Sequence, residues 1–258
     1  SNQLLVALPA EAKARWRNHL EPVELHAGQV LYESGCRQSH VYFPSNAIVS
    51  LLYVTENGKS AEIAVVGREG VVGIALFMGG DATADRAVVQ SAGMAYRLTA
   101  QLIKTEFDQS PAVVRLLLSY TQALITQMAQ TAVCNRHHSV DQQVCRWLLW
   151  TLDRWQGNEL KVTQEQIAQM LGVRREGVTE TALKLQQAGL IRYSRGHVTV
   201  LDRHGLEHRA CECYGVVKAE YDRLLPDIGG KPAVRLPSLP DAVDRGHAGT
   251  VVPLRRYR

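Results

Sequence analysis

The sequence has few of the features that assign a protein to a membrane, secreted or disulfide-rich class. No stretch approaches the ~20 consecutive apolar residues that a membrane-spanning helix requires. The N-terminus lacks the basic segment followed by an apolar core that marks a secretory signal. The five cysteines are odd in number and widely scattered, which argues against a disulfide framework. We therefore expect a soluble, cytoplasmic protein with reduced thiols and no membrane partner.

Catalytic motifs are scarce as well. The chain contains no glycine-rich phosphate loop of known spacing and no serine turn that would expose a nucleophile. Gly67-Arg68-Glu69-Gly70 is typical of a β-turn, and acidic residues do not pair at matched positions on neighbouring elements. We predict that the protein is not an enzyme and needs no cofactor. Its net charge of +4 permits nucleic-acid binding without requiring it.

The first half of the chain contains short β-type runs separated by turn residues. Asn57-Gly58 lies between two such runs and indicates a hairpin, because both central positions of a tight hairpin turn favour positive φ. Many short strands at this spacing predict a sandwich or barrel. We expect a jelly-roll-like β-roll within residues 1–109, after a short helical entry in residues 1–22. Its strands are predicted at 23–26, 30–32, 40–43, 47–54, 60–66, 86–90 and 93–98.

A long helix is predicted to follow the β-roll over residues 110–138. Ser110 can cap its start, and Pro111 suits the first helical position. Apolar residues then recur at helical spacing over roughly 35–40 Å, at ~1.5 Å per residue. Such a helix is either the core of one domain or the dimerisation helix that pairs with a second subunit. For the dimer, the predicted interface residues are Leu117, Leu118, Leu124, Ile125 and Met128.

The most specific pattern lies in residues 159–201. Thr163 and Gln166 form a capping box that opens one helix, and Gly172 provides a short turn. A second helix starts near Arg174 and ends before Gly189, which suits a left-handed C-terminal position. Two strands at 190–193 and 197–201 complete the order helix, turn, helix, hairpin. This order predicts a winged helix-turn-helix within a domain spanning 139–225.

The second helix of this unit carries the predicted DNA contacts. In such a fold its N-terminal residues enter the major groove, where Arg can pair with guanine and Glu can accept from cytosine. The charge of residues 161–200 is modestly basic, and the alternative is a fold of this kind used for protein contact. The predicted DNA-binding residues are Thr163, Gln164, Arg174, Arg175, Glu176, Thr179, Arg192 and Arg195, with Lys161 beside them.

Together these segments resemble the Crp/Fnr family of bacterial transcription regulators. The resemblance runs from Leu4 to Leu201 and is carried by 27–32, 46–52 and 162–191. It implies an α+β fold with a cyclic-nucleotide-binding-like β-roll, a long dimerisation helix and a C-terminal winged helix-turn-helix. It also implies a homodimer that reads a two-fold symmetric site in double-stranded DNA. RNA polymerase and an unidentified small-molecule effector are further candidate partners.

The motifs of that family are matched unevenly. The recognition helix of the family usually opens Ser-Arg-Glu-Thr-Val, and this chain has Arg174-Arg175-Glu176-Gly177-Val178 there. In the cyclic-AMP-binding members, Gly-Glu-Leu-Gly and an Arg-Ser or Arg-Thr pair hold the nucleotide. This chain keeps Gly73 and Arg86 but has Ile74 and Ala87 where a carboxylate and a hydroxyl are expected. Two lost hydrogen bonds would weaken binding by ~10²–10⁴-fold, so we predict that cyclic AMP is not the effector.

Metal and redox sites are the remaining candidates. No cysteines cluster near the N-terminus, so the iron–sulfur site of some family members is not expected. His204, His208 and Cys211 share one face of a helix predicted over 204–225, with Cys213 pointing away from it. The sequence favours an ordinary amphipathic helix, and hence no metal. Packing or exposure is also favoured for Cys36 and His40 and for Cys134, His137 and His138, with a haem ligand as the alternative. A redox-responsive thiol is the alternative for Cys211 or Cys213.

Two further alternatives concern function and the end of the chain. The β-roll could be free of any ligand, with the regulator controlled by its abundance or redox state. The chain could instead be a cyclic-nucleotide-binding-like module that acts through protein contacts. Residues 226–258 have no sustained period and are rich in turn residues, so we expect a disordered tail.

Overall fold

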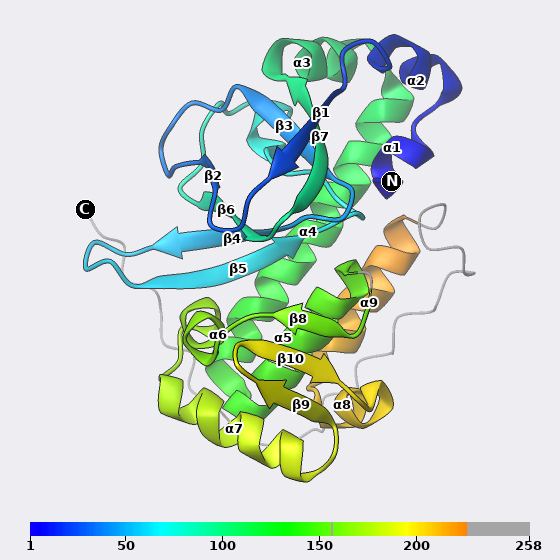
Figure 1. The fold of residues 1–258 in the computed structure, drawn as a ribbon. Helices are drawn as coiled ribbons and strands as arrows, with labels where there is room; N and C mark the ends of the chain where they lie inside the picture. The colour runs from blue at the N-terminus through cyan, green and yellow to red at the C-terminus, as the bar shows by residue number, and fades with distance from the viewer. Residues whose placement is uncertain (156, 226–258) are drawn as a thin grey trace, which may run out of the picture.

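The computed structural model describes residues 1–155 and 157–225. An N-terminal β domain, a long helix and a C-terminal helical domain with a small sheet follow one another along the chain (Figure 1). This arrangement confirms the predicted α+β class. The predicted tail at 226–258 lies outside the described residues. No helix in the described part of the chain is both long and apolar enough to cross a membrane.

The β domain consists of two antiparallel sheets. One has the strand order β2-β6-β4-β5 and the other has β1-β7-β3. Their inward side chains form one core, in which Val41, Phe43, Val49, Ala87 and Leu98 are buried. All the predicted strands are found, with ends shifted by at most two residues. The strands are β1 (Glu21–Leu25), β2 (Val30–Tyr32), β3 (His40–Pro44), β4 (Ile48–Val54), β5 (Ser60–Val66), β6 (Arg86–Ser91) and β7 (Gly93–Thr99).

The hairpin between β4 and β5 has a longer loop than Asn57-Gly58 predicts. Gly58 has a φ of +79°, whereas Asn57 is not among the described residues with positive φ. The Asn57 side chain instead accepts a hydrogen bond from the Thr55 hydroxyl at 2.6 Å, and the backbone N–H of Thr55 donates to the carbonyl of Lys59. Only one left-handed residue is needed in this loop, because the side chain of Asn57 closes the rest of the turn.

Short helices complete the N-terminal domain. Helices α1 (Gln3–Ala7) and α2 (Ala10–Trp16) form the predicted entry, and Trp16 packs on Phe43 with ring centroids 5.9 Å apart. The sequence analysis missed helix α3 (Ala100–Gln109) and the 3-10 turn η1 (Ile74–Leu76). Helix α3 buries Ile103 and packs Leu102 and Phe107 on the core, so it has a helical apolar face that the sequence analysis overlooked.

Helix α4 (Pro111–His137) is the predicted long helix, and its 27 residues span about 40 Å. Pro111 occupies the first helical position, while the side chain of the cap residue Ser110 makes no capping bond. One face of α4 is buried in the core of its own chain, and this face includes Leu117 and Leu124. The predicted interface was therefore partly wrong, because those two side chains are already covered. The large apolar side chains that α4 exposes are Leu118, Ile125 and Val133.

The C-terminal domain contains the predicted winged helix-turn-helix. The sheet has the order β8-β10-β9, and the short strand β8 was not predicted. The single helix predicted over 204–225 is two helices, because Ala210 adopts an extended conformation with ψ of 154°. The elements are α5 (Val140–Arg154), β8 (Glu159–Lys161), α6 (Gln164–Leu171), α7 (Arg175–Gln187), β9 (Ile191–Ser194), β10 (His197–Val200), α8 (Arg203–Arg209) and α9 (Cys213–Leu224).

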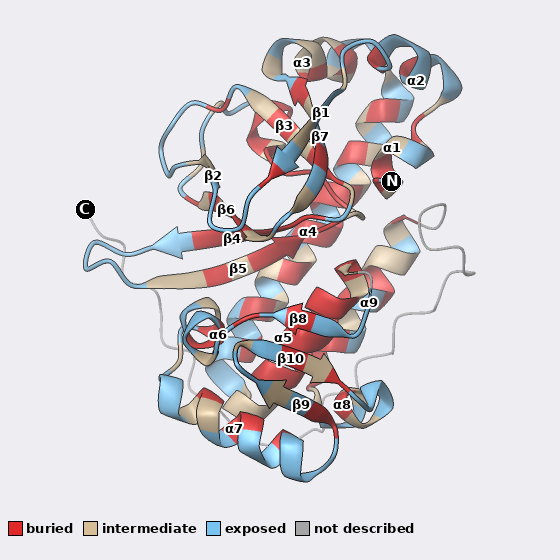
Figure 2. Cartoon of the chain, in the orientation of Figure 1, coloured by how far each residue is buried: buried red, intermediate tan, exposed pale blue. Residues whose placement is uncertain are grey.

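Buried polar contacts join the two domains. Helix α5 is buried along most of its length (Figure 2), and Trp147 on it donates to the buried Glu62 of β5 at 3.0 Å. Arg154 of α5 pairs with Glu69 at 2.6 Å and donates to Gln127 of α4 at 3.2 Å. These contacts hold α5, and with it the rest of the C-terminal domain, against the β-roll and the long helix.

Candidate nucleic-acid interface

Helices α6 and α7 form the helix-turn-helix, and local chemistry sets their ends. The backbone N–H of Gln166 donates to the Thr163 hydroxyl at 3.2 Å, and Gln166 accepts from the backbone N–H of Thr163 at 2.8 Å. This is the predicted capping box. Gly172 ends α6 with a φ of +67°, a conformation that favours glycine. The chain then turns into α7, as Figure 1 shows.

The N-terminal end of α7 projects charged side chains into solvent. Arg174, Arg175 and Glu176 are all exposed, and Arg174 is the cap residue without a side-chain capping bond. The guanidinium of Arg175 approaches Glu165 of α6 only to 3.9 Å, which is a weak surface contact. The structure therefore presents two arginines and one glutamate together at a helix N-terminus. That end also offers backbone N–H groups and a partial positive charge, which suit phosphate.

Two predicted contact residues play an internal part. The Thr179 hydroxyl donates to the side-chain oxygen of Gln164 at 2.7 Å, so this pair ties α7 to the start of α6. The backbone N–H of Gln164 donates to the hydroxyl of Tyr193 at 3.0 Å and is not available for phosphate. Sequence reasoning missed Tyr193, whose partner lies 29 residues away. We therefore regard Thr179 and Gln164 as residues that position α7 against α6.

The hairpin between β9 and β10 forms the wing. Arg195 and Gly196 both have positive φ, at +49° and +79°, as a tight two-residue hairpin turn requires. Arg192 and Arg195 are exposed, and so is Lys161 on the neighbouring strand β8. The wing thus carries three exposed basic residues on one small sheet.

The predicted effector residues of the β-roll, Gly73, Arg86 and Ala87, are less exposed than the charged residues at the start of α7. Gly73 has a φ of +100° and precedes η1, so its backbone matches the need for glycine. Arg86 pairs with Glu33 at 3.2 Å. Ala87 is fully buried and its side chain belongs to the core. Of the three, only Arg86 presents a polar side chain, and one of its terminal nitrogens is engaged by Glu33.

A second hydrogen-bonded pair involves Asp85, the residue before Arg86. The Tyr32 hydroxyl donates to the carboxylate of Asp85 at 2.8 Å, and Asp85 is buried. Burial, together with the nearby Asp85 charge, raises the pKa of Tyr32 well above its ordinary value. The phenol therefore remains a hydrogen-bond donor at neutral pH. Asp85, the residue before Arg86, and Glu33, its ion-pair partner, thus place two carboxylates close to this arginine.

The histidines and cysteines near the C-terminus do not form the predicted set. His204 and His208 contact each other on α8, with their Nε2 atoms 3.0 Å apart, and both are exposed. Cys211 is buried and lies 3.5 Å from the Sγ atom of Cys134. Cys213, which was expected to point away, is buried beside it. The break between α8 and α9 causes both corrections, because a continuous helix would separate Cys211 and Cys213 by ~200°.

Comparisons with known families agree with this architecture. Residues 22–110 match the cyclic nucleotide-binding domain, and residues 142–209 match the Crp-like helix-turn-helix domain. No curated protein matches the chain in a sequence search.

Solved structures with the same fold come from several bacteria. A transcriptional regulator of the Crp/Fnr family from Eubacterium rectale has a TM-score of 0.63 and 19% identity, with 80% of this chain and 96% of that chain covered. FixK2 from Bradyrhizobium japonicum also has a TM-score of 0.63, at 13% identity over 74% of this chain and 98% of that one. TTHA1359 from Thermus thermophilus has a TM-score of 0.59 and 22% identity, covering 74% and 98%. With both domains matched in the family's order, the chain belongs to the Crp/Fnr family of DNA-binding transcription regulators.

Proposed function

We propose that this regulator is a homodimer that reads a two-fold symmetric operator through the N-terminal end of α7, and that its effector is not cyclic AMP. The observation that carries the proposal is the joint exposure of Arg174, Arg175 and Glu176 at that end. Direct readout needs side chains that reach the edges of bases without first breaking internal contacts. The bond between Thr179 and Gln164 supports the same assignment, because it fixes the helix that carries them.

The contacts divide into base readout and phosphate contact. Each arginine can form a paired hydrogen bond with guanine, and Glu176 can accept from the amino group of cytosine. The three wing residues Lys161, Arg192 and Arg195 supply positive charge for the flanking phosphates. Phosphate contacts add affinity and salt dependence, whereas the α7 contacts add sequence preference.

The exposed apolar face of α4 supports the homodimer. Leu118 and Ile125 lie seven residues apart, and Val133 lies eight residues further on, which approximates a heptad. Their side chains are 46%, 52% and 46% exposed, a large apolar exposure for one helix. A second copy of α4 would cover this face. The proposed interface keeps Leu118 and Ile125, adds Val133, and places the partly buried Met128 at its edge.

The effector assignment follows from the β-roll. Cyclic phosphate would have to displace Glu33 from Arg86, and the fully buried Ala87 offers it no hydroxyl. Ile74 offers no acceptor for the ribose. Losing two such hydrogen bonds weakens binding by ~10²–10⁴-fold, so ordinary concentrations of cyclic AMP would leave the roll unliganded.

The rival is a regulatory module that acts through protein contacts. It predicts no salt-dependent affinity for duplex DNA. A DNA-reading dimer instead loses affinity steeply as salt rises, because phosphate contacts release counterions.

The test begins with selection of bound sequences from a random DNA pool. The proposal predicts one palindromic motif, two chains per duplex, and half-sites about one turn, roughly 34 Å, apart. Inserting about half a helical turn between the half-sites then lowers affinity at least ~100-fold, because the two α7 helices no longer face the same side of the duplex. Unchanged affinity, or one chain per duplex, contradicts the dimer. Failure to recover any motif favours the protein-contact rival.

A further inference from the structure

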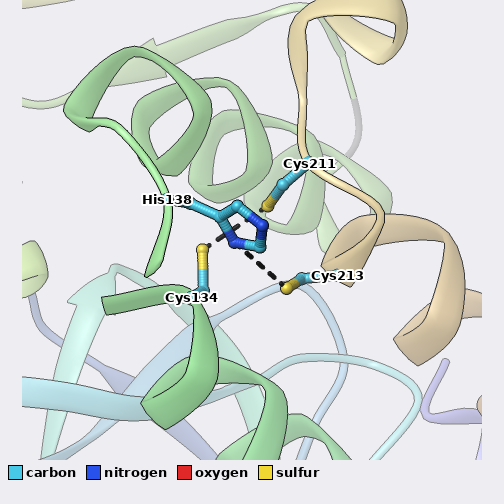
Figure 3. A group of neighbouring side chains, drawn as sticks. All are labelled: Cys134, His138, Cys211 and Cys213. Carbon is cyan, nitrogen blue, oxygen red and sulfur yellow. Dashed lines mark hydrogen bonds between the residues drawn. The ribbon is translucent and has the colours of Figure 1, made fainter. Parts of the chain in front are cut away.

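Four metal-ligating side chains meet at the end of α4. Their ligand atoms, the Sγ atoms of Cys134, Cys211 and Cys213 and a ring nitrogen of His138, all lie within 4.8 Å of one another. Figure 3 shows the four side chains converging from two directions. Cys134 lies in the last turn of α4 and His138 directly follows that helix, whereas Cys211 lies between α8 and α9 and Cys213 is the first residue of α9. The three thiols are buried, and the His138 side chain is only 13% exposed.

The spacing of these atoms fits the edges of a tetrahedron around zinc. Zinc–sulfur bonds of ~2.3 Å and zinc–nitrogen bonds of ~2.05 Å imply sulfur–sulfur edges of about 3.8 Å and sulfur–nitrogen edges of about 3.6 Å. The Cys134 and Cys211 sulfurs are 3.5 Å apart, and the Cys213 sulfur is 3.6 Å from Nδ1 of His138. Three thiolates and one imidazole are also a usual ligand set for structural zinc.

The orientation of His138 adds an independent observation. Its Nδ1 faces Cys213, while its Nε2 lies 3.2 Å from the carboxylate of Glu212. Histidines that bind metal through one ring nitrogen commonly donate the other N–H to a carboxylate, which fixes the ring and its tautomer. Glu212 lies between the two cysteines in the sequence, so the same turn supplies both the ligands and the support.

The surroundings also suit an anionic centre. A divalent ion with three thiolates carries a net charge of about −1, since 2 − 3 = −1. Arg146 of α5 is buried and contacts α4 at Thr131, three residues before Cys134. Its guanidinium donates to Thr131 at 3.3 Å and lies over the ring of Trp150. A buried cation beside the cluster would balance the charge of the loaded site.

We propose that Cys134, His138, Cys211 and Cys213 bind one Zn²⁺ ion in a closed tetrahedral site. A disulfide between Cys134 and Cys211 would account for only two of the four groups, and it would leave the orientation of His138 without a role. The spacings Cys134-x-x-x-His138 and Cys211-x-Cys213 are the sequence signal. Neither pair is distinctive without the fold that joins them.

The site would act as a clamp. Helix α4 ends at His137 and α5 begins at Val140, so the chain passes from the long helix into the C-terminal domain at this point. A metal bound there joins the end of α4 to the turn between α8 and α9, about 75 residues later in the chain. Loading would therefore fix how the C-terminal domain sits on the dimerisation helix. The effect of loading on DNA affinity rests on the proposed function, whereas metal binding itself does not.

The first experiment measures metal in the full-length chain. Reduced protein is loaded with zinc chloride, dialysed against a competing chelator, and analysed for zinc, iron and sulfide. We expect one zinc ion per chain, an X-ray absorption spectrum of three sulfurs and one nitrogen, and a tetrahedral thiolate spectrum when Co²⁺ replaces zinc. Protein that keeps no zinc, or that holds iron with sulfide, overturns the proposal.

Substitutions then assign the ligands. Cys134→Ser, Cys211→Ser, Cys213→Ser and His138→Ala should each lower zinc affinity at least ~100-fold, while Cys145→Ser, at another buried cysteine, should leave it unchanged. Glu212→Gln should lower affinity only about 10-fold and keep the same Co²⁺ spectrum, because it removes the support but no ligand. Full zinc affinity in Cys211→Ser and Cys213→Ser overturns the assignment. If a variant does not fold, the spectrum of the Co²⁺-loaded wild type still decides the ligand set.

The clamp has its own readout. Removing zinc should lower the melting temperature of the full chain, because the metal binds the folded state. It should also weaken binding to the selected operator about 10-fold, with recovery when zinc is restored. If operator binding is equal with and without zinc while the stoichiometry holds, the clamp is wrong and the site stands. If no operator exists, the proposed function fails, and the zinc analysis is unaffected.

Discussion

The β-roll residues expected to hold a nucleotide (Gly73, Ile74, Arg86 and Ala87) and the start of α7 both depart from the family's usual sequence, but their arginines have different surroundings. In the β-roll, Arg86 is paired with Glu33, and its neighbour Ala87 is part of the core. On α7, Arg174 and Arg175 project into solvent at a helix N-terminus. An arginine kept in a motif is therefore informative only with its partners. Arg86 is thus held by one carboxylate while its buried Nε has no partner among the described residues, whereas the two arginines of α7 are exposed.

The largest effect on this contrast is expected when the exposed charged residues at the start of α7 are removed. The triple change Arg174→Ala, Arg175→Ala and Glu176→Ala should weaken specific DNA binding at least ~100-fold, since each base contact contributes about 1–3 kcal/mol. Sedimentation should still show the same oligomer, because α4 is untouched. Gln187→Ala, an exposed position at the far end of α7, is the matched control. Sequence preference that survives the triple change would mean that another element reads the DNA.

A second test addresses the contact between the N-terminal β domain and helix α5 of the C-terminal domain. Glu62 of β5 is buried against Trp147 of α5, and burial raises its pKa to about 7. A carboxyl with a raised folded pKa stabilises the fold fully below its unfolded pKa, and this contribution is lost as pH rises through the folded pKa. Relative to Glu62→Gln, the wild type should therefore lose up to ~3 kcal/mol of unfolding free energy between about pH 4.5 and 7.

Denaturant unfolding at a series of pH values measures this difference. Glu106→Gln is the control, because Arg15 lowers the pKa of Glu106. Stability from a lowered pKa is present above the unfolded pKa, so the Glu106 difference should stay constant in the same window. If the difference in unfolding free energy between wild type and Glu62→Gln also does not change with pH, burial of the Glu62 carboxyl against α5 does not make stability depend on pH.

A third test sharpens the account of α7 itself. Gly177 stands where the family has threonine, and a Cβ there would meet the methyl groups of Val140 at 3.6 and 3.7 Å, an ordinary contact. Gly177→Ala should thus raise the unfolding free energy by about 0.5–1 kcal/mol through helix propensity. Thermal unfolding measures it. A loss of stability would mean that α7 packs on α5 more tightly than the structure shows.

The smallest effect is expected at Arg86 in the β-roll. Arg86→Ala removes a half-exposed ion pair and should change stability by less than ~1 kcal/mol, with operator affinity unchanged. Arg97→Ala breaks a similarly exposed pair with Glu21 and is the matched control. If only the Arg86 variant alters DNA binding, these β-roll residues take part in signalling and the contrast drawn above fails.

The sequence predicts local features of this protein well. Periodicity and turn residues placed the strands of the roll, the capping box of Thr163 and Gln166, the turn at Gly172 and the left-handed Gly189. Features that depend on distant partners were missed. Strand β8 is formed by its pairing with β10, which lies more than 30 residues later, and Leu117 and Leu124 are buried in a core that also draws on the β-roll and on the end of α9.

The candidate sites show the same division. Exposure of Arg174 and Arg175 could be expected from the helix pattern. The pairing of Arg86 with Glu33, 53 positions away, could not, and neither could the meeting of Cys134 with Cys211 across 77 positions. Hydrogen bonds between neighbouring residues can be predicted from the sequence, whereas contacts between side chains far apart in the chain can be seen only in the folded structure.

The most direct test of the central claim is a titration of the selected operator with wild-type protein, in the presence and absence of cyclic AMP. The account predicts tight binding that weakens steeply with salt and is identical in both arms. The charged residues at the start of α7 are exposed without any ligand, and Ile74 and Ala87 cannot hydrogen-bond cyclic AMP. Binding that appears only with cyclic AMP would contradict it, since Ile74 and Ala87 would then be compatible with a functional nucleotide site.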